Sequence, residues 1–294
     1  MLYRIEFFVI DRTIGIVTNS KYIADFLNSE LINSKVVLVE KVTSYDYGVI
    51  EKSCVESEIG VVLTDENIIT GFLNYCGNNI PYMKIYNFAM MQSVRVFVNL
   101  VVANVFKDIC LPLHCSSILM DRQGIGFVGE KNSGKSTLTI GTILWKDAKL
   151  VSDDITFFWI DNGNIRFFGL FNGAHMYENE KYMYKNKIYD KKCQKTDMVK
   201  KRIIFNDAII EENAILNQLF FPSIIENEED CFEIINIGKN EKKELIRDNI
   251  IRFNSISYSN EETIVDYIYT HIKFTKCLVG KNFINTIDAL TKFV

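Results

Sequence analysis

Residues 129–137 read GEKNSGKST and constrain the fold of this 294-residue chain more than any other segment. They match the phosphate-binding pattern G-x-x-x-x-G-K-[ST] at Gly129, Gly134, Lys135 and Ser136. Glycines let successive backbone N–H groups turn inward and form a concave anion site. An apolar run precedes the loop, and residues 137–144 can begin a helix. The segment therefore predicts a strand, a loop and a helix in that order, with the helix N-terminus beneath a phosphate.

The loop as a whole is a candidate nucleotide site. Lys135 is expected to reach the terminal phosphates, and the Ser136 hydroxyl to ligate Mg²⁺. ATP and Mg²⁺ are the predicted cofactors, although the motif alone does not select the base. The residues expected to contact the nucleotide are Gly129, Glu130, Lys131, Asn132, Ser133, Gly134, Lys135, Ser136 and Thr137.

Composition and charge narrow the class of protein. The chain has 48% hydrophobic and 24% charged residues, as globular proteins do, and a net charge of −4 that argues against nucleic-acid binding. Its seven cysteines include no C-x-x-C pair, which favours reduced thiols over disulfides or zinc. The start lacks a signal-peptide core, and the apolar segment 94–106 is too short to span a bilayer. We expect a cytoplasmic protein without a membrane partner, and self-association stays open.

The pattern along the chain predicts two domains. Residues 1–87 alternate strand-like runs with probable helices at 20–31 and 66–75, which indicates a small α+β domain. The Asn-Asn-Ile-Pro stretch at 78–81 is the boundary signal. The almost wholly apolar segment 88–109 predicts a buried helix under the sheet of the second domain, which covers residues 88–294.

The second domain is predicted to be α/β with a mixed sheet. Asn162-Gly163 is typical of a hairpin turn, and a hairpin argues against a simple doubly wound parallel sheet. Helical segments are expected toward the C-terminus, and the Lys- and Tyr-rich stretch 181–201 is interpreted as a long functional loop. Strands are expected at 113–119, 124–128, 149–152, 155–160, 165–168, 214–221 and 231–237.

Two groups of polar residues are expected beside the loop. Asp153 and Asp154 follow the apolar run 149–152, where an acid that organises Mg²⁺ normally lies. Neighbouring residues of a strand point to opposite faces, so one acid could take a proton while the other helps to hold the metal. His114 is expected at the end of a strand beside the loop, where it could tune a carboxylate or sense a phosphate, and Cys115 is interpreted as a small buried hydrophobe.

His114, the loop and the Val-Ser-Asp-Asp run at 151–154 together resemble the HPr kinase/phosphorylase family over residues 110–170. The catalytic domain of that family is related in fold to ATP-dependent phosphoenolpyruvate carboxykinase. The resemblance implies that His114 and Asp153 act with Lys135, Asp153 as the base toward a serine hydroxyl. Ser136 and Asp154 would then hold the metal, and Arg202 is the nearest candidate for a basic residue that clamps the transferred phosphate.

The sequence departs from the family at two places. Thr137 stands where the family usually has an acidic residue, and only Phe171-Asn-Gly-Ala-His175 resembles its second glycine-rich signature. These departures leave the reverse, phosphorylase reaction open. Shorter relatives phosphorylate a serine of a precursor peptide, and the chain is similar to those as well.

The predicted function is therefore an ATP-dependent kinase acting on a hydroxyl, most simply a Ser or Thr of a peptide or protein. A small-molecule kinase on the same scaffold is one alternative, and a nucleotide-binding switch with little catalysis is another. A guanine-specific switch should carry N-K-x-D, but in residues 186–190 the acid comes one residue late.

Overall fold

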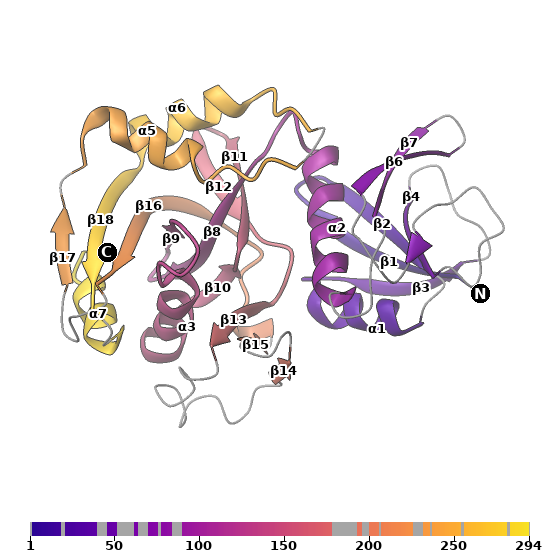
Figure 1. Ribbon diagram of the computed structural model, residues 1–294, viewed down its shortest axis with the longest axis horizontal. Helices are drawn as coiled ribbons and strands as arrows, with labels where there is room; N and C mark the ends of the chain where they lie inside the picture. The colour runs from indigo at the N-terminus through magenta and orange to yellow at the C-terminus, as the bar shows by residue number, and fades with distance from the viewer. Residues whose placement is uncertain are drawn as a thin grey trace. The chain divides into compact units, whose positions relative to one another are not determined.

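The computed structural model divides into two compact units, residues 1–105 with 253–255, and residues 106–252 with 256–294 (Figure 1). Among the described residues, no helix combines the length and the apolar character needed to cross a membrane. The described residues are 2–18, 21–39, 46–51, 62–63, 70–75, 78–83, 90–177, 193–195, 200–205, 207–225, 232–235, 237–253, 256–280 and 283–293.

The first unit is a small α+β assembly. Its five-stranded sheet has the order β3-β1-β2-β4-β5, and β6 and β7 form a separate antiparallel pair. The inward side chains of β1 and β2 and one face of α1 supply buried apolar residues. The elements are β1 (Leu2–Val9), β2 (Arg12–Thr18), α1 (Lys21–Glu30), β3 (Lys35–Val39), β4 (Asp46–Glu51), β5 (Val62–Leu63), β6 (Thr70–Tyr75), β7 (Asn78–Met83) and α2 (Met90–Val105).

The apolar helix α2 belongs to this first unit, which corrects the expectation that it packs under the sheet of the second. Within this unit a buried ion pair joins helices α1 and α2. Both Arg95 Nε and Nη2 donate to the Glu30 carboxylate, at 2.7 and 2.6 Å, and both side chains are buried. Breaking such a pair would leave a buried charge without compensation, so it ties α2 to α1.

Two other predictions for this unit were wrong. Residues 70–75 form strand β6 where a helix was expected, because they pair with β7. The stretch 78–81, taken as a domain boundary, lies inside β7, and the two units divide after Val105.

The second unit is a mixed α/β structure, as predicted. Its main sheet has the path β10-β8-β11-β12-β16-β18-β17, with β9 paired to both β8 and β16, and β13-β15-β14 form a small sheet. The elements are β8 (Leu111–Met120), β9 (Gln123–Val128), α3 (Lys135–Lys146), β10 (Lys149–Ser152), β11 (Ile155–Asp161), β12 (Asn164–Phe168), β13 (Gly173–Tyr177), β14 (Cys193–Lys195), β15 (Lys200–Ile204), η4 (Asp207–Ile209), β16 (Asn213–Ile224), β17 (Phe232–Ile235), α5 (Lys239–Arg247), α6 (Glu261–His271), β18 (Lys273–Val279) and α7 (Phe283–Leu290).

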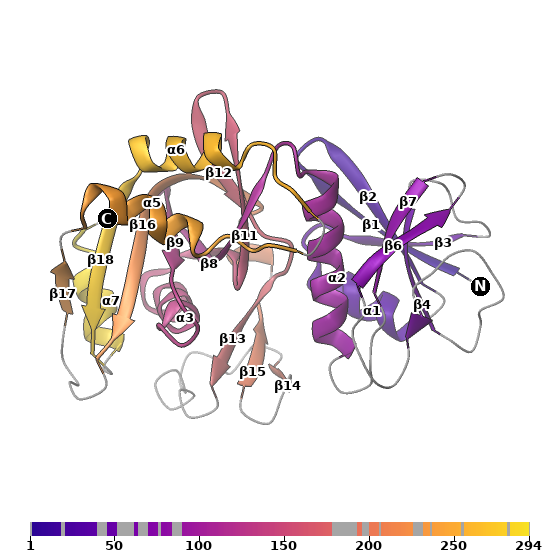
Figure 2. The ribbon, with the colours of Figure 1, turned by 45° about the horizontal axis from the view of Figure 1, so that its top comes forward.

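The long strands β8 and β16 organise the main sheet. Their first residues pair with the β11–β12 hairpin, and their later residues pair with β9, which lies between them. The hairpin turns at Asn162-Gly163 with positive φ angles of 48° and 71°, as the Asn-Gly signal predicted. The β16–β9 and β16–β18 pairs are parallel and the others antiparallel, so the sheet is mixed. Figure 2 shows α5 and α6 side by side at one end of the sheet.

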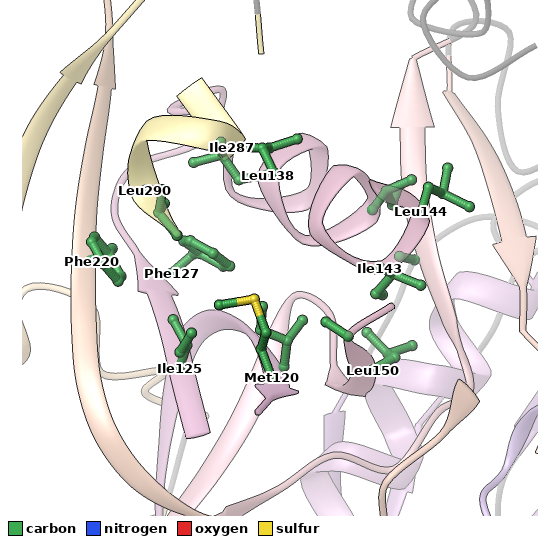
Figure 3. Packing of buried hydrophobic residues seen from close by; sticks show 14 of the residues in the cluster. Met120, Ile125, Phe127, Leu138, Ile143, Leu144, Leu150, Phe220, Ile287 and Leu290 are labelled. Carbon is green, nitrogen blue, oxygen red and sulfur yellow. The ribbon is translucent and has the colours of Figure 1, made fainter. Parts of the chain in front are cut away.

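The core next to the loop lies between α3, α7 and the main sheet. Ala174, Met176, Ile203 and Phe205 place β13 and the end of β15 on this core, so the small sheet packs there too. The strand before the loop and the helix after it are thus both anchored, which fixes the loop between them. Figure 3 shows the labelled side chains of the cluster, Met120, Ile125, Phe127, Leu138, Ile143, Leu144, Leu150, Phe220, Ile287 and Leu290.

Most strands predicted for this unit agree with the structure to within a few residues. Strand β18 was missed, and it occupies a position inside the sheet beside β16. The stretch 181–201 lies largely outside the described residues, and within it only β14 and the beginning of β15 are described.

Candidate functional site

The loop joins β9 directly to α3. Gly134 is the N-cap of the helix and has φ 95°, a conformation that glycine adopts without strain. Gly129 has φ 155°, and a Cβ there would lie 3.0 Å from Ser133 Oγ. A glycine N-cap offers no side chain to the first N–H groups of the helix, so this end suits an anion. The side chains of Glu130, Lys131 and Asn132 are exposed on the loop, and Thr137 is buried in the first turn.

Lys135 lies within the loop rather than in solvent. Its Nζ donates to the carbonyl oxygens of Gly129 and Glu130, each at 2.7 Å, and the residue is buried. An ammonium group has three N–H donors and no acceptor, so these bonds hold its charge at the centre of the concave backbone. A phosphate bound in the loop would meet that charge.

The two acids lie at an irregular joint between β10 and β11. Both strands pair with β8 but on opposite edges of it, Ser152 opposite Ser117 and Ile155 opposite His114, so residues 153–154 carry the chain from one edge to the other. Asp154 has a left-handed backbone with φ 75°, which is uncommon for a residue other than glycine and interrupts the alternation of side chains. Asp153 contacts Ser116 and Asp154 contacts His114, two side chains on the same face of β8, which corrects the expectation that the acids face opposite sides.

The Asp153 carboxylate is a buried acceptor of three hydrogen bonds. Its Oδ1 accepts from Ser116 Oγ at 2.6 Å and from Ser136 Oγ at 2.8 Å. Its Oδ2 accepts from the backbone N–H of His175 at 2.8 Å, and the imidazole Nδ1 of that residue lies 3.5 Å away. The side chain of Asp153 is 0% exposed.

Burial alone would raise the pKa of the Asp153 carboxyl, but the His175 imidazole and the Ser116 hydroxyl stabilise the charged form. Together with the backbone N–H they hold the pKa of Asp153 well below its usual range. A carboxylate with these partners is ionised and strongly held. It is better suited to orient Ser136 and a cation than to gain a proton.

Asp154 has a different environment. Its Oδ1 lies 3.4 Å from His114 Nε2, and the two side chains are 48% and 32% exposed. Partial burial of the carboxyl would by itself raise the pKa of Asp154. The hydrogen bond and charge of His114 have the larger, opposite effect, so the pKa of Asp154 lies below its usual value. An ionised, accessible carboxylate held by an imidazole can accept a proton from a bound hydroxyl.

Cys115 is a structural residue. Burial raises the pKa of its thiol to about 12, so the thiol stays neutral. This agrees with the interpretation of Cys115 as a small buried hydrophobe. Around it, hydroxyl groups tie the strands together: Thr156 Oγ1 donates to the Cys115 carbonyl at 2.8 Å, and Ser152 Oγ to the carbonyl of Ile155 at 2.5 Å. The second bond spans the two acids and stabilises the joint.

The small sheet forms a further wall of the site. His175 in β13 is directly opposite Arg202 in β15, so their side chains leave the same face. Arg202 is buried, with its Cζ 5.9 Å from the centre of the Phe171 ring. A Cβ on Gly173 would lie 2.9 Å from Arg202 Nε, which means that the missing side chain makes room for the guanidinium.

The structure thus brings the loop, His114, Asp153 and Asp154 together, and places Arg202 one strand away from them. It pairs Ser136 with Asp153 and His114 with Asp154, the reverse of the pairing that the resemblance implied.

Sequence reasoning assigned no role to Ser116 or His175. A signal existed for Ser116, because it is two residues from His114 and so lies on the same face of β8. His175 lies at the end of the Phe171–His175 stretch that resembles a family signature, but only the tertiary structure brings it to Asp153.

No family model matches this sequence, and no curated protein matches it. Among solved structures, the chain is similar to the Hpr(Ser) kinase/phosphatase from Coxiella burnetii, with 12% sequence identity and a TM-score of 0.29. The similarity covers 62% of this chain and 96% of that chain.

Proposed function

We propose that this protein is an ATP- and Mg²⁺-dependent kinase that transfers the γ-phosphoryl group to the hydroxyl of a serine or threonine in a peptide or protein. The observation that carries the proposal is that two adjacent acids beside the loop have different surroundings. Asp153 is buried and bonded to Ser136 of the loop, whereas Asp154 is half exposed beside His114. Protein kinases transfer phosphoryl groups to hydroxyls with one acid at the metal and another at the acceptor hydroxyl.

The residues present fit Mg²⁺. This ion prefers oxygen ligands and is usually bound through one or two protein groups together with substrate phosphates. Ser136 and Asp153 would hold it, with Asp154 adjacent. No group of three or more His, Cys, Asp or Glu side chains in the described part of the chain could hold a metal by itself, which agrees with that mode of binding. When bound, Mg²⁺ neutralises charge on the β- and γ-phosphates.

The side chains around it would perform the transfer. Lys135 and the loop N–H groups hold the phosphates, and Asp154 accepts the proton of the acceptor hydroxyl. The acceptor oxygen bonds to the γ-phosphorus while the bond from that phosphorus to the bridging oxygen of ATP breaks, so ADP leaves with that oxygen. Arg202 remains the proposed clamp for the transferred phosphate, because it lies opposite His175.

The proposal is tested by incubating the purified protein with γ-labelled ATP, Mg²⁺ and Ser- or Thr-containing peptides, including those encoded by neighbouring genes. Label is expected on a peptide with a hydroxyl and not on its alanine-substituted counterpart. Label on a small metabolite alone would identify a small-molecule kinase. Tight ATP binding without transfer to any acceptor would favour a nucleotide switch.

His114→Ala is expected to lower kcat about 10- to 100-fold, as the loss of an orienting partner does, with little change in the Kd for ATP. His114→Gln, whose amide nitrogen can take the place of Nε2, should recover part of the loss. The matched control is His271→Ala, because His271 is exposed on α6. Steady-state kinetics and thermal unfolding are the measurements. A lower Tm with normal kcat would show that His114 is only structural.

A further inference from the structure

We propose that His175 is a positioning residue, which holds the Asp153 carboxylate so that its Oδ1 faces Ser136 of the loop. The proposal rests on the proposed function and adds to it a residue from outside the loop and the acid pair. The orientation of the Asp153 carboxylate can be measured whether or not the protein shows kinase activity.

The first observation is that two groups of His175 meet the same oxygen. The backbone N–H donates to Asp153 Oδ2 at 2.8 Å, and the imidazole Nδ1 lies 3.5 Å from it. The other oxygen, Oδ1, accepts from Ser116 and Ser136. The two oxygens of the Asp153 carboxylate therefore have different hydrogen-bond partners.

The orientation of the Asp153 carboxylate depends on its hydrogen-bond partners. The last torsion of an aspartate side chain has a broad, roughly two-fold energy profile, so a carboxylate without partners turns easily. Because the two oxygens are rigidly linked, holding Oδ2 also fixes the direction of Oδ1. His175 thereby selects the oxygen that the Ser136 hydroxyl meets, and with it the direction of the Ser136 lone pairs.

The second observation is that His175 is itself held in place. Its neighbours Ala174 and Met176 are 0% and 1% exposed in the core that packs on α3. Side chains alternate along a strand, so the imidazole leaves the face opposite to that core. The pairing of β13 with β15 fixes the strand along its length. The core thus anchors the histidine that meets Asp153.

The test compares His175→Ala with His175→Asn, whose side-chain amide can place a nitrogen near the position of Nδ1. The backbone N–H remains in both, so the comparison isolates the side chain. In His175→Ala we expect the Mg²⁺ concentration that half-saturates ATP binding to rise about 10- to 100-fold, as when an outer partner of a metal ligand is lost. His175→Asn should recover most of it. Calorimetry measures binding, thermal unfolding reports the fold, and His271→Ala is the control.

Unchanged Mg²⁺ dependence in a folded His175→Ala protein would overturn the inference, while the proposed function would stand if the wild type still transfers phosphate. An equal loss in the alanine and asparagine variants, accompanied by a lower Tm, would also overturn it, because a purely structural role predicts that result. Crystal structures of the nucleotide-free variants give a readout that needs no activity. In His175→Ala the Asp153 carboxylate, still bonded to the backbone N–H and to Ser116, should lose its single orientation and its short contact with Ser136, and His175→Asn should restore both. A retained contact in the alanine variant contradicts the inference even if the protein binds no nucleotide.

Discussion

Replacing Lys135 by alanine is expected to weaken ATP binding about 10- to 100-fold, the value of a hydrogen bond or two to a charged group, and to bring phosphoryl transfer below detection. The effect on transfer is larger because Lys135 stabilises charge that develops on the γ-phosphoryl group as the reaction proceeds. Its ammonium already lies inside the loop, bonded to the carbonyls of Gly129 and Glu130.

The matched control is Lys131→Ala, which removes the same charge from an exposed position of the same loop. It should leave binding and transfer close to wild type, since the Lys131 side chain is exposed and alanine keeps the backbone N–H that this residue contributes to the loop. Calorimetry with ATP and a single-turnover assay measure the two quantities. Wild-type affinity and activity in Lys135→Ala would remove the basis for the whole proposal, because no other charge has been placed at the centre of the loop.

The second large effect is expected from Asp154→Asn. Asparagine keeps the size of the side chain but cannot accept a proton at neutral pH. Phosphoryl transfer should fall about 10²- to 10⁴-fold, the usual contribution of a general base, while ATP–Mg²⁺ affinity changes much less. Rapid-quench single-turnover measurements isolate the chemical step from binding and product release.

Asp153→Asn is its matched partner and should fail in a different way. The asparagine side chain carries no charge and has only one acceptor oxygen for the Ser116, Ser136 and His175 donors. We therefore expect weaker Mg²⁺-dependent ATP binding together with a lower Tm, because buried donors lose their partner.

The two variants also show which of the two acids is the general base and which one holds the metal. If Asp153→Asn lost only the chemical step and Asp154→Asn lost the Mg²⁺ dependence, the roles would be those that the family resemblance implies. If both variants transferred phosphate at the wild-type rate, the acid pair would be structural.

Features that depend on neighbouring residues could be predicted from the sequence. The loop between β9 and α3, the hairpin at Asn162-Gly163 and the strands on either side of the acids are specified by glycines, turn residues and short apolar runs. Features that depend on distant partners could not. Strand β18 is a strand because it pairs with β16 and β17, and residues 70–75 are extended because they pair with β7.

The same distinction holds at the site. The loop, Asp153, Asp154 and His114 are all visible as residue types at a spacing along the chain. Their contacts depend on the backbone between β10 and β11, where Asp154 is left-handed and both carboxylates meet side chains of β8. The third contact of Asp153 comes from β13, which the core beneath α3 holds next to it. A spacing specifies which groups can meet, but the direction of each side chain follows from backbone angles and from packing between distant segments, so the partner of each acid was decided only in the folded chain.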